Sequence, residues 1–231
     1  MADDWQERLP GSGAPPQAHK ADIKPLTAEE AHRLIDVAEA EDTTYADVIL
    51  MAIHTGLRMG ELLAVSWDDV DTERGKLTVR LSLQQLPGQK ATLRKPKSAG
   101  SQRTIPLGPT ATRLLSQARR RQLRQRLAAG PAYEEGGLVF STALGTPLGA
   151  NNVRRILQGM LARAGVREIR FHDLRHTHAT LLLMRGVHPK IVAERLGHAN
   201  IAITLDTYSH VLPNLQEEAV RDLDAWLSEG R

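Results

Sequence analysis

The segment FHDLRHTHATLLLMRGVHPKIVAERLGHANIAITLDTYSH, residues 171–210, combines reactive polar side chains with three short stretches of helical periodicity. His172 and Arg175 are three residues apart, so on a helix they share one face. The tripeptide LGH at 196–198 closes the second stretch, and Tyr208 lies in the third. An arginine forks onto phosphate oxygens, histidines donate hydrogen bonds, and a tyrosine oxygen can form a covalent ester. The segment is therefore typical of a site that holds a phosphate group and attacks it.

This order of residues resembles the final block of the tyrosine recombinases, the phage-integrase type, which reads H-x-x-R, then L-G-H, then Y. Two upstream stretches extend the resemblance. The sequence TGLRMGEL at 55–62 is similar to the first arginine block of that family, and KSAGSQR at 97–103 is similar to its lysine-bearing hairpin. The resemblance covers roughly residues 23–228. Its specificity comes from the blocks occurring in order with compatible gaps.

The resemblance implies a catalytic set drawn from all of these blocks. A phosphodiester under attack carries extra negative charge, so it needs fixed donors, an in-line nucleophile and an acid for the leaving 5′ oxygen. Two arginines would clamp the phosphate, two histidines would handle protons and hydrogen bonds, a hairpin lysine would be the acid and a tyrosine the nucleophile. The implied catalytic residues are Arg58, Lys97, His172, Arg175, His198 and Tyr208, and Glu61 is a supporting residue that would orient a guanidinium group.

Each of these residues also has a more ordinary interpretation. Arg58 is a possible helix cap, Glu61 a solvated acid, Lys97 a solvated lysine beside Lys95, and Tyr208 a core or surface tyrosine. An arginine on the apolar helix around position 175 needs a charged partner, because burying an unpaired charge is costly, so an internal ion pair is the alternative there. The histidines allow a metal site, but no HExxH pattern occurs. We expect His176 and His178 to be structural, and no metal or cofactor to be required.

Composition bounds the class of protein. The 231 residues suffice for one large domain or two small ones, and the chain contains no Cys, which excludes disulfides and Cys-ligated zinc. The N-terminus has no signal-peptide pattern, and no apolar run is long enough to span a bilayer. We therefore expect a cytoplasmic, DNA-associated protein of bacterial or phage origin.

Charge is unevenly placed along the chain. Residues 74–133 contain no Asp or Glu but 14 of the 30 Lys and Arg, which leaves 16 basic against 27 acidic residues, a balance of −11, elsewhere. Such a split predicts a polyanion-binding face, with a merely solvated basic surface as the alternative.

Periodicity predicts a mainly α fold with one small antiparallel β-sheet, an α+β class, and the resemblance implies the same arrangement. The sheet would contain one strand over residues 76–83 and two more over 91–96 and 103–107. Helices are expected over residues 27–40, 44–54, from 58 onward, 108–128, 151–164, 170–185, 189–196, 203–211 and 213–228.

Residues 1–22 have no periodicity and are expected to be a linker or disordered lead, followed by a catalytic domain over 23–231. The N-terminal core-binding domain of the family is expected to be absent. The last helix, within residues 213–231, carries apolar positions on one stripe, and Trp226 should be buried. It would pack either on its own domain or, as the family does, on a neighbouring protomer.

The sequence therefore predicts the catalytic domain of a site-specific recombinase or integrase of a mobile element. Tyr208 would attack double-stranded DNA to give a 3′-phosphotyrosyl bond and a free 5′ hydroxyl, and strand exchange and religation would follow. The protein would be a monomer when free and a homotetramer on paired DNA sites, with no membrane partner. Two alternatives stay open: a type IB topoisomerase-like nicking–closing enzyme with the same residues, and a DNA-binding module without catalysis.

Overall fold

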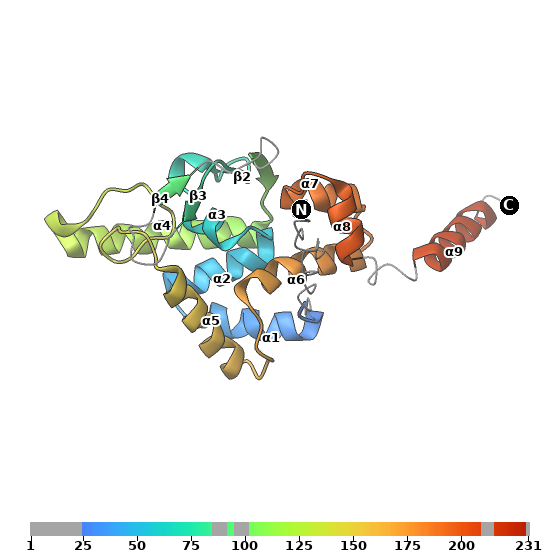
Figure 1. The fold of residues 1–231 in the computed structure, drawn as a ribbon, viewed down its shortest axis with the longest axis horizontal. Helices are drawn as coiled ribbons and strands as arrows, with labels where there is room; N and C mark the ends of the chain where they lie inside the picture. Colours follow the sequence, from blue (N-terminus) through green and yellow to red (C-terminus); the bar gives the residue numbers. More distant parts are fainter. Residues whose placement is uncertain (1–24, 85–91, 95–101, 209–214, 230–231) are drawn as a thin grey trace, which may run out of the picture.

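The computed structural model describes residues 25–84, 92–94, 102–208 and 215–229, and most of these are helical (Figure 1). The helices are α1 (Ala28–Glu39), α2 (Thr44–Thr55), α3 (Met59–Leu63), α4 (Pro109–Ala129), α5 (Ala150–Arg163), α6 (Phe171–Met184), α7 (Pro189–Leu196), α8 (Ile201–Tyr208) and α9 (Leu215–Ser228). The strands are β1 (Val70–Asp71), β2 (Lys76–Val79), β3 (Ser82–Gln84), β4 (Thr92–Arg94) and β5 (Arg103–Pro106). The mainly α, α+β prediction is confirmed.

Helix α2 lies at the centre of the packing and contacts α1, α4, α5 and α6. It is mostly apolar, and nine of its 12 residues are buried, as expected for a helix with neighbours on several sides. Gly56 ends it in the left-handed conformation, with φ 68°. A Cβ atom there would lie 2.6 Å from the His178 ring, so glycine is also required by close packing. The turn therefore fixes where the chain enters α3 and Arg58.

The described strands form two small sheets, where the sequence predicted one. The antiparallel order β1-β2-β5 makes the first sheet, and the β3–β4 hairpin makes the second. The single strand predicted over residues 76–83 is divided, because β2 pairs with β5 whereas β3 packs on α3. At Gly60 a Cβ would lie 2.6 Å from Ser82 Oγ and 2.8 Å from the Leu83 carbonyl oxygen. Alternation continues across the break, so the sequence does not reveal this change of partner.

The basic segment at 74–133 is substantially neutralised within the chain. Helix α4 lies against the start of α2 and the connection before it, where Arg121 pairs with the buried Asp47 of α2 and with the exposed Asp42 of the connection. Seven of the segment's 14 basic residues pair with acids from outside it: Arg74, Arg80, Arg103, Arg113, Arg121, Arg124 and Arg126. The whole segment is therefore not one unpaired basic face, because folding brings distant acids onto it.

The described end of the chain is exposed. Figure 1 shows α9 apart from the other helices, and Val220, Leu223 and Leu227 are exposed. Trp226 is 70% exposed, so the expected burial of this side chain does not occur within the chain. Among the described helices, none combines the length and apolarity that a membrane span requires.

Candidate active site

The first part of the site is a carboxylate that holds two guanidinium groups. Glu61 on α3 accepts hydrogen bonds from Arg58 at 2.8 Å and from Arg103 on β5 at 3.0 Å. Burial by itself would raise the pKa of Glu61, but Arg103 and Arg58 outweigh it and lower the pKa below its ordinary value. Glu61 is 4% exposed and Arg58 is 42% exposed, so the carboxylate is an internal anchor for a cation that faces outward.

The second arginine is buried without a counterion among the described residues. Arg175 on α6 is 2% exposed and donates to two backbone carbonyl groups, those of Gly56 at 2.9 Å and Leu196 at 2.6 Å. The alternative of an internal ion pair is therefore not seen among the described residues, where carbonyl oxygens satisfy the donors without neutralising the charge. Burial and the charges of Arg58 and Arg103 lower the pKa of Arg175 to about 9, and the nearby Glu61 carboxylate only partly offsets them. Such a cation favours an anion next to it.

The tripeptide at 196–198 is where α7 meets these arginines. Gly197 ends α7 with φ 68°, a conformation that favours glycine. A Cβ at this position would lie 2.8 Å from the Arg103 NH1 atom, and Arg103 Nε donates to the Arg195 carbonyl oxygen at 2.7 Å. Arg103 therefore packs against one side of this turn, and the Leu196 carbonyl group just before Gly197 accepts a hydrogen bond from Arg175.

His198 follows this turn and is fixed by a side chain of α8. Its Nδ1 atom lies 2.8 Å from the Thr204 hydroxyl oxygen, which leaves Nε2 as the ring atom available to a ligand. Burial and the charges of Arg175 and Arg58 lower the pKa of His198 to about 4. Sequence reasoning did not identify Thr204. The only available signal was its position six residues after His198, which by itself is weak.

The tyrosine is held by a histidine that we expected to be structural. His176 Nδ1 lies 2.8 Å from the Tyr208 hydroxyl oxygen, and the His172 ring packs edge-on against His176 with centroids 4.9 Å apart. Tyr208 is 1% exposed, and burial raises its pKa to about 12. His172 presents part of its side chain to solvent, but the protein packed around the rest of the ring, together with the charges of Arg175 and Arg58, lowers its pKa. The four-residue spacing of His172 and His176 was the signal for a shared face.

His178 makes contacts that position α6 and α7. Its Nδ1 atom lies 2.8 Å from the Ile53 carbonyl oxygen, and its Nε2 atom accepts from Arg195 Nε at 3.0 Å. Arg195 also donates to the carbonyl oxygens of Pro106 and His54. This network joins α2, α6, α7 and β5 behind the site, and none of its members reaches Tyr208.

Lys97 lies outside the described residues, in the connection between β4 and β5. The two described ends of that connection belong to different sheets, and Arg103 at one end contacts Glu61. Within the described part of the chain, no three metal-ligating side chains lie close enough together to hold an ion.

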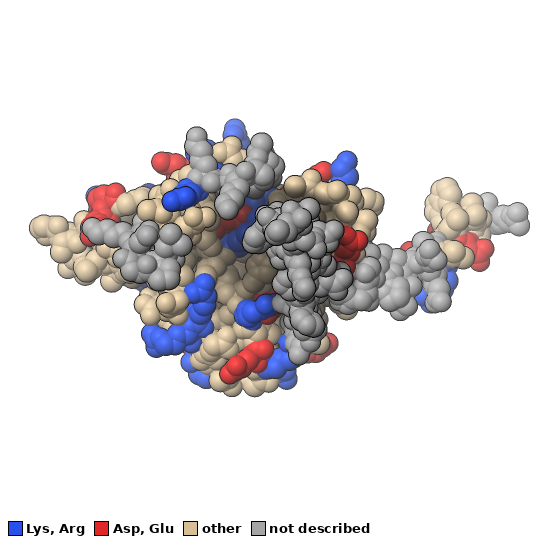
Figure 2. All heavy atoms as spheres, viewed as in Figure 1, with Lys and Arg blue, Asp and Glu red and all other residues tan. Residues whose placement is uncertain are grey.

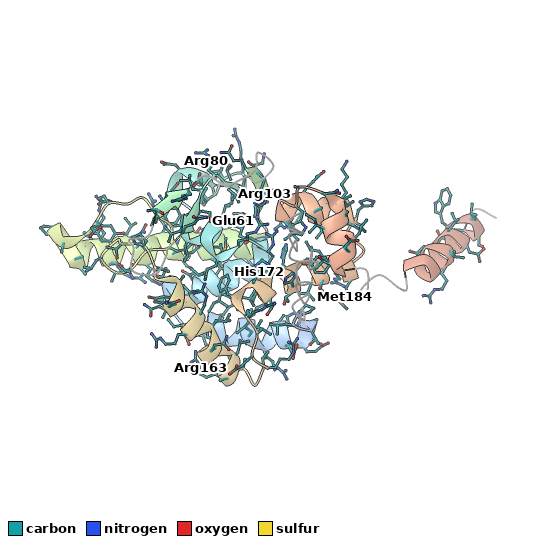
Figure 3. All side chains as sticks on the ribbon, in the orientation of Figure 1. Glu61, Arg80, Arg103, Arg163, His172 and Met184 are labelled. Atoms are coloured by element: carbon teal, nitrogen blue, oxygen red, sulfur yellow. The ribbon has the colours of Figure 1, made fainter. Side chains whose placement is uncertain are left out.

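A cavity of about 430 Å³ adjoins the site on the side of His172. Its lining residues are Met59, Arg154, Gln158, Arg170, Phe171 and His172. Figure 2 shows Lys and Arg atoms around a hollow on the same broad face, and Figure 3 places Glu61, Arg103 and His172 toward the middle of the molecule. The arrangement presents guanidinium and imidazole groups to an incoming anion beside a buried phenol.

Comparisons with known proteins show which family the chain belongs to. The model of the phage integrase family matches residues 24–214. A tyrosine recombinase XerC-like protein of Caldanaerobacter subterraneus is 35% identical over 223 residues, covering 92% of this chain and 56% of that protein. Tyrosine recombinase XerA of Pyrococcus furiosus is 31% identical over 209 residues, covering 89% and 63% respectively. The chain spans about half the length of several curated relatives it matches.

Solved structures share the fold. The Tn1549 transposon integrase in complex with a circular intermediate DNA superposes with a TM-score of 0.72 at 20% identity, covering 88% of this chain and 67% of that one. A crystal structure of XerA recombinase gives a TM-score of 0.61 at 22% identity, covering 87% and 64%. The chain therefore belongs to the phage integrase family and carries a tyrosine recombinase catalytic domain.

Proposed function

We propose that this chain catalyses site-specific DNA strand breakage and rejoining, with Tyr208 as the nucleophile. The observation that carries the proposal is the buried Arg175 cation, which has carbonyl partners but no direct ion pair among the described residues. A phosphate between Arg175, Arg58 and the histidines would supply the missing negative charge. The phosphodiester of DNA carries that charge in a form that two guanidinium groups recognise.

The roles follow from the positions. Arg58 and Arg175 would bind non-bridging oxygens, and the free edge of His198 would donate a further hydrogen bond. His172, on the same face of α6 as Arg175, would complete the set of donors. Preorganised donors of this kind stabilise charge that grows in the transition state, and they need no metal ion. The neutral state of His198, which the surrounding arginines favour, would shift toward the cation as the phosphate anion arrives.

The covalent step would conserve the energy of the phosphodiester bond. Tyr208 Oη would bond to phosphorus while the 5′ oxygen leaves with a proton from Lys97, giving a 3′-phosphotyrosyl linkage. The 5′ hydroxyl of a partner strand would reverse the step. The assignment of Lys97 rests on its resemblance to the family's lysine-bearing hairpin and on its position in the connection that leads into β5, whose Arg103 contacts Glu61.

Double-stranded DNA is the proposed partner, and paired sites would assemble a homotetramer from free monomers. The exposed apolar residues of α9, Val220, Leu223, Trp226 and Leu227, support docking on a neighbouring protomer. Exposed apolar side chains also lie on α6, α7 and α8, among them Met184 and Ile191, and they are candidates for the receiving surface. Action on the DNA of a mobile element would place the protein in the cytoplasm.

The test uses a suicide DNA substrate, nicked beside the scissile phosphate so that the cleaved end diffuses away. Arg58→Met should slow covalent capture about 100-fold or more, the usual loss for one such donor, while DNA binding changes little. Arg58 is half-exposed, so this change should leave the fold intact, and Arg163→Met on α5 is the matched control. If Arg58→Met captured DNA at the wild-type rate, Arg58 would not bind the scissile phosphate as proposed.

A second assay separates recombination from nicking and closing. A recombinase should exchange strands between two DNA molecules that carry sites, whereas a topoisomerase-like enzyme would relax a supercoiled plasmid without exchange. If the protein relaxed the plasmid but exchanged no strands at any concentration of site-bearing DNA, it would be a topoisomerase-like enzyme and not a recombinase.

A further inference from the structure

We propose that His176 is the catalytic proton acceptor for Tyr208, holding the phenol by its Nδ1 atom and taking the proton as the bond to phosphorus forms. This inference rests on the proposed function, because it assigns the proton that the nucleophile must lose. It concerns a residue that the sequence resemblance did not include in the catalytic set.

The first support is the geometry of the pair. His176 Nδ1 and Tyr208 Oη are 2.8 Å apart, within hydrogen-bond distance, although the residues are 32 positions apart in the sequence. The ring centroids lie 5.8 Å apart with a 55° tilt, so the contact is made by the polar edges and the rings do not stack. The only hydrogen bond seen for the Tyr208 hydroxyl within the described residues is this one.

The second support is the direction of that hydrogen bond. Tyr208 is 1% exposed and packs against Ala179, Leu183, Val192 and Leu196, so water does not reach its body. A buried hydroxyl proton needs an acceptor, and Nδ1 is the acceptor available among the described residues. The phenol therefore donates, and Nδ1 carries the lone pair that receives the proton during attack.

The third support is the charge around His176. The titratable groups that face it are His172, Asp173, Arg170 and Arg175 from α6 and its first turn, together with His198 and Tyr208 from the α7–α8 side. Burial and the net positive field lower the pKa of His176 to about 4, so its imidazole is neutral at neutral pH and Nδ1 is free to accept.

The proton cannot move ahead of the chemistry. Burial raises the pKa of Tyr208 to about 12 and lowers the pKa of His176 to about 4, so the pair is a neutral phenol and a neutral imidazole before attack. Transfer accompanies formation of the Oη–phosphorus bond, which removes electron density from the phenol oxygen. An incoming phosphate anion also offsets the charges of Arg58 and Arg175, and this raises the affinity of His176 for a proton.

Cleavage involves one bond formed to phosphorus, one bond broken and two proton transfers. Tyr208 Oη bonds to phosphorus, its proton goes to His176 Nδ1, and the 5′ oxygen departs with a proton from Lys97. In the reverse step the 5′ hydroxyl returns its proton to the lysine amine, and the imidazolium returns its proton to the phenol oxygen as it leaves. No oxidant, reductant or metal ion is required.

The test compares His176→Asn with His176→Ala in single-turnover cleavage of the suicide substrate at saturating protein. The Asn side chain places an amide oxygen near the Nδ1 position, so it accepts the phenol hydrogen bond but does not take up the proton. We expect both variants to cleave about 100-fold or more slowly, with DNA binding and circular dichroism unchanged. His188→Asn at the N-cap of α7 is the matched control, because Asn is a good cap there.

The outcomes are distinct. If His176→Asn cleaves at the wild-type rate while His176→Ala is slow, His176 only positions Tyr208, and the proposal is overturned. Wild-type rates in both variants would overturn it as well. If His176→Ala fails to fold, the Asn variant alone decides, because slow cleavage by a folded, DNA-binding protein supports the transfer. A wild-type protein that forms no covalent adduct would instead overturn the proposed function.

Discussion

Acid should destabilise this fold through His178. This side chain is 7% exposed, and burial together with the charge of Arg195 lowers its pKa to about 4. Nε2 accepts the Arg195 Nε–H, so a proton added to Nε2 would place two donors and two cations against each other. His178 therefore stays neutral in the folded protein until the solution is strongly acidic.

The magnitude follows from proton linkage. In the unfolded chain the imidazole titrates near its ordinary pKa of 6.5, whereas in the folded protein it titrates near 4. Below pH 6.5 the unfolded state binds a proton that the folded state does not, so stability is full above this pH and falls as the pH approaches 4. Between pH 7 and pH 5 this single group should cost about 2 kcal/mol. That is a large share of the stability of an ordinary domain.

The assay is urea unfolding of the wild type and of His178→Gln at pH 7 and pH 5. The Gln amide oxygen takes the place of Nε2 toward Arg195 but does not titrate, so this variant should lose about 2 kcal/mol less over the same interval. Asp47 and the other histidines titrate in both proteins and cancel in the difference. Equal losses in the two proteins would refute the reasoning, since the acid sensitivity would then arise elsewhere.

Three further predictions concern other parts of the molecule. Gly197→Ala should lower the free energy of unfolding by about 2 kcal/mol and slow cleavage, because the new Cβ would press on Arg103 in a left-handed turn; an unchanged melting temperature would contradict this. Truncation after Leu212 should leave a folded domain that no longer assembles on paired sites, as seen by gel filtration with DNA; unfolding on truncation would show that α9 stabilises its own domain. Lys97→Ala should cleave slowly on ordinary DNA but recover on a substrate with a bridging 5′ sulfur, since a thiolate leaves without a proton. Equal defects on both substrates would exclude Lys97 as the acid.

Much of the fold could be predicted because local signals agreed with it. The capping box at Thr27 and Glu30 opens α1, and Gly56 and Pro189 stand at helix boundaries as predicted. The sheet was less predictable, because β2 and β3 share one alternating pattern but have different partners. The neutralisation of the basic segment was hidden for a similar reason, since Asp42 and Asp47 are distant in sequence from Arg121.

The site shows the same division. Spacing alone placed His172 and Arg175 on one helical face, and the motif order brought Arg58 and His198 into the candidate set. No local pattern indicated that His176, directly after Arg175, contacts a tyrosine from another helix. The sequence also did not indicate that the Arg175 guanidinium contacts backbone carbonyl groups in place of a carboxylate, because these carbonyl groups come from distant parts of the chain.

The most direct test of the central claim is to identify the residue joined to DNA. The chain has three tyrosines, Tyr45, Tyr133 and Tyr208, so mass spectrometry of the peptide that stays linked to a suicide substrate distinguishes them. The account predicts a 3′-phosphate linkage on Tyr208, a free 5′ hydroxyl on the other DNA end, loss of the adduct in Tyr208→Phe, and an unchanged adduct in Tyr45→Phe and Tyr133→Phe. An adduct that persists in Tyr208→Phe, or one that maps to Tyr45 or Tyr133, would contradict it.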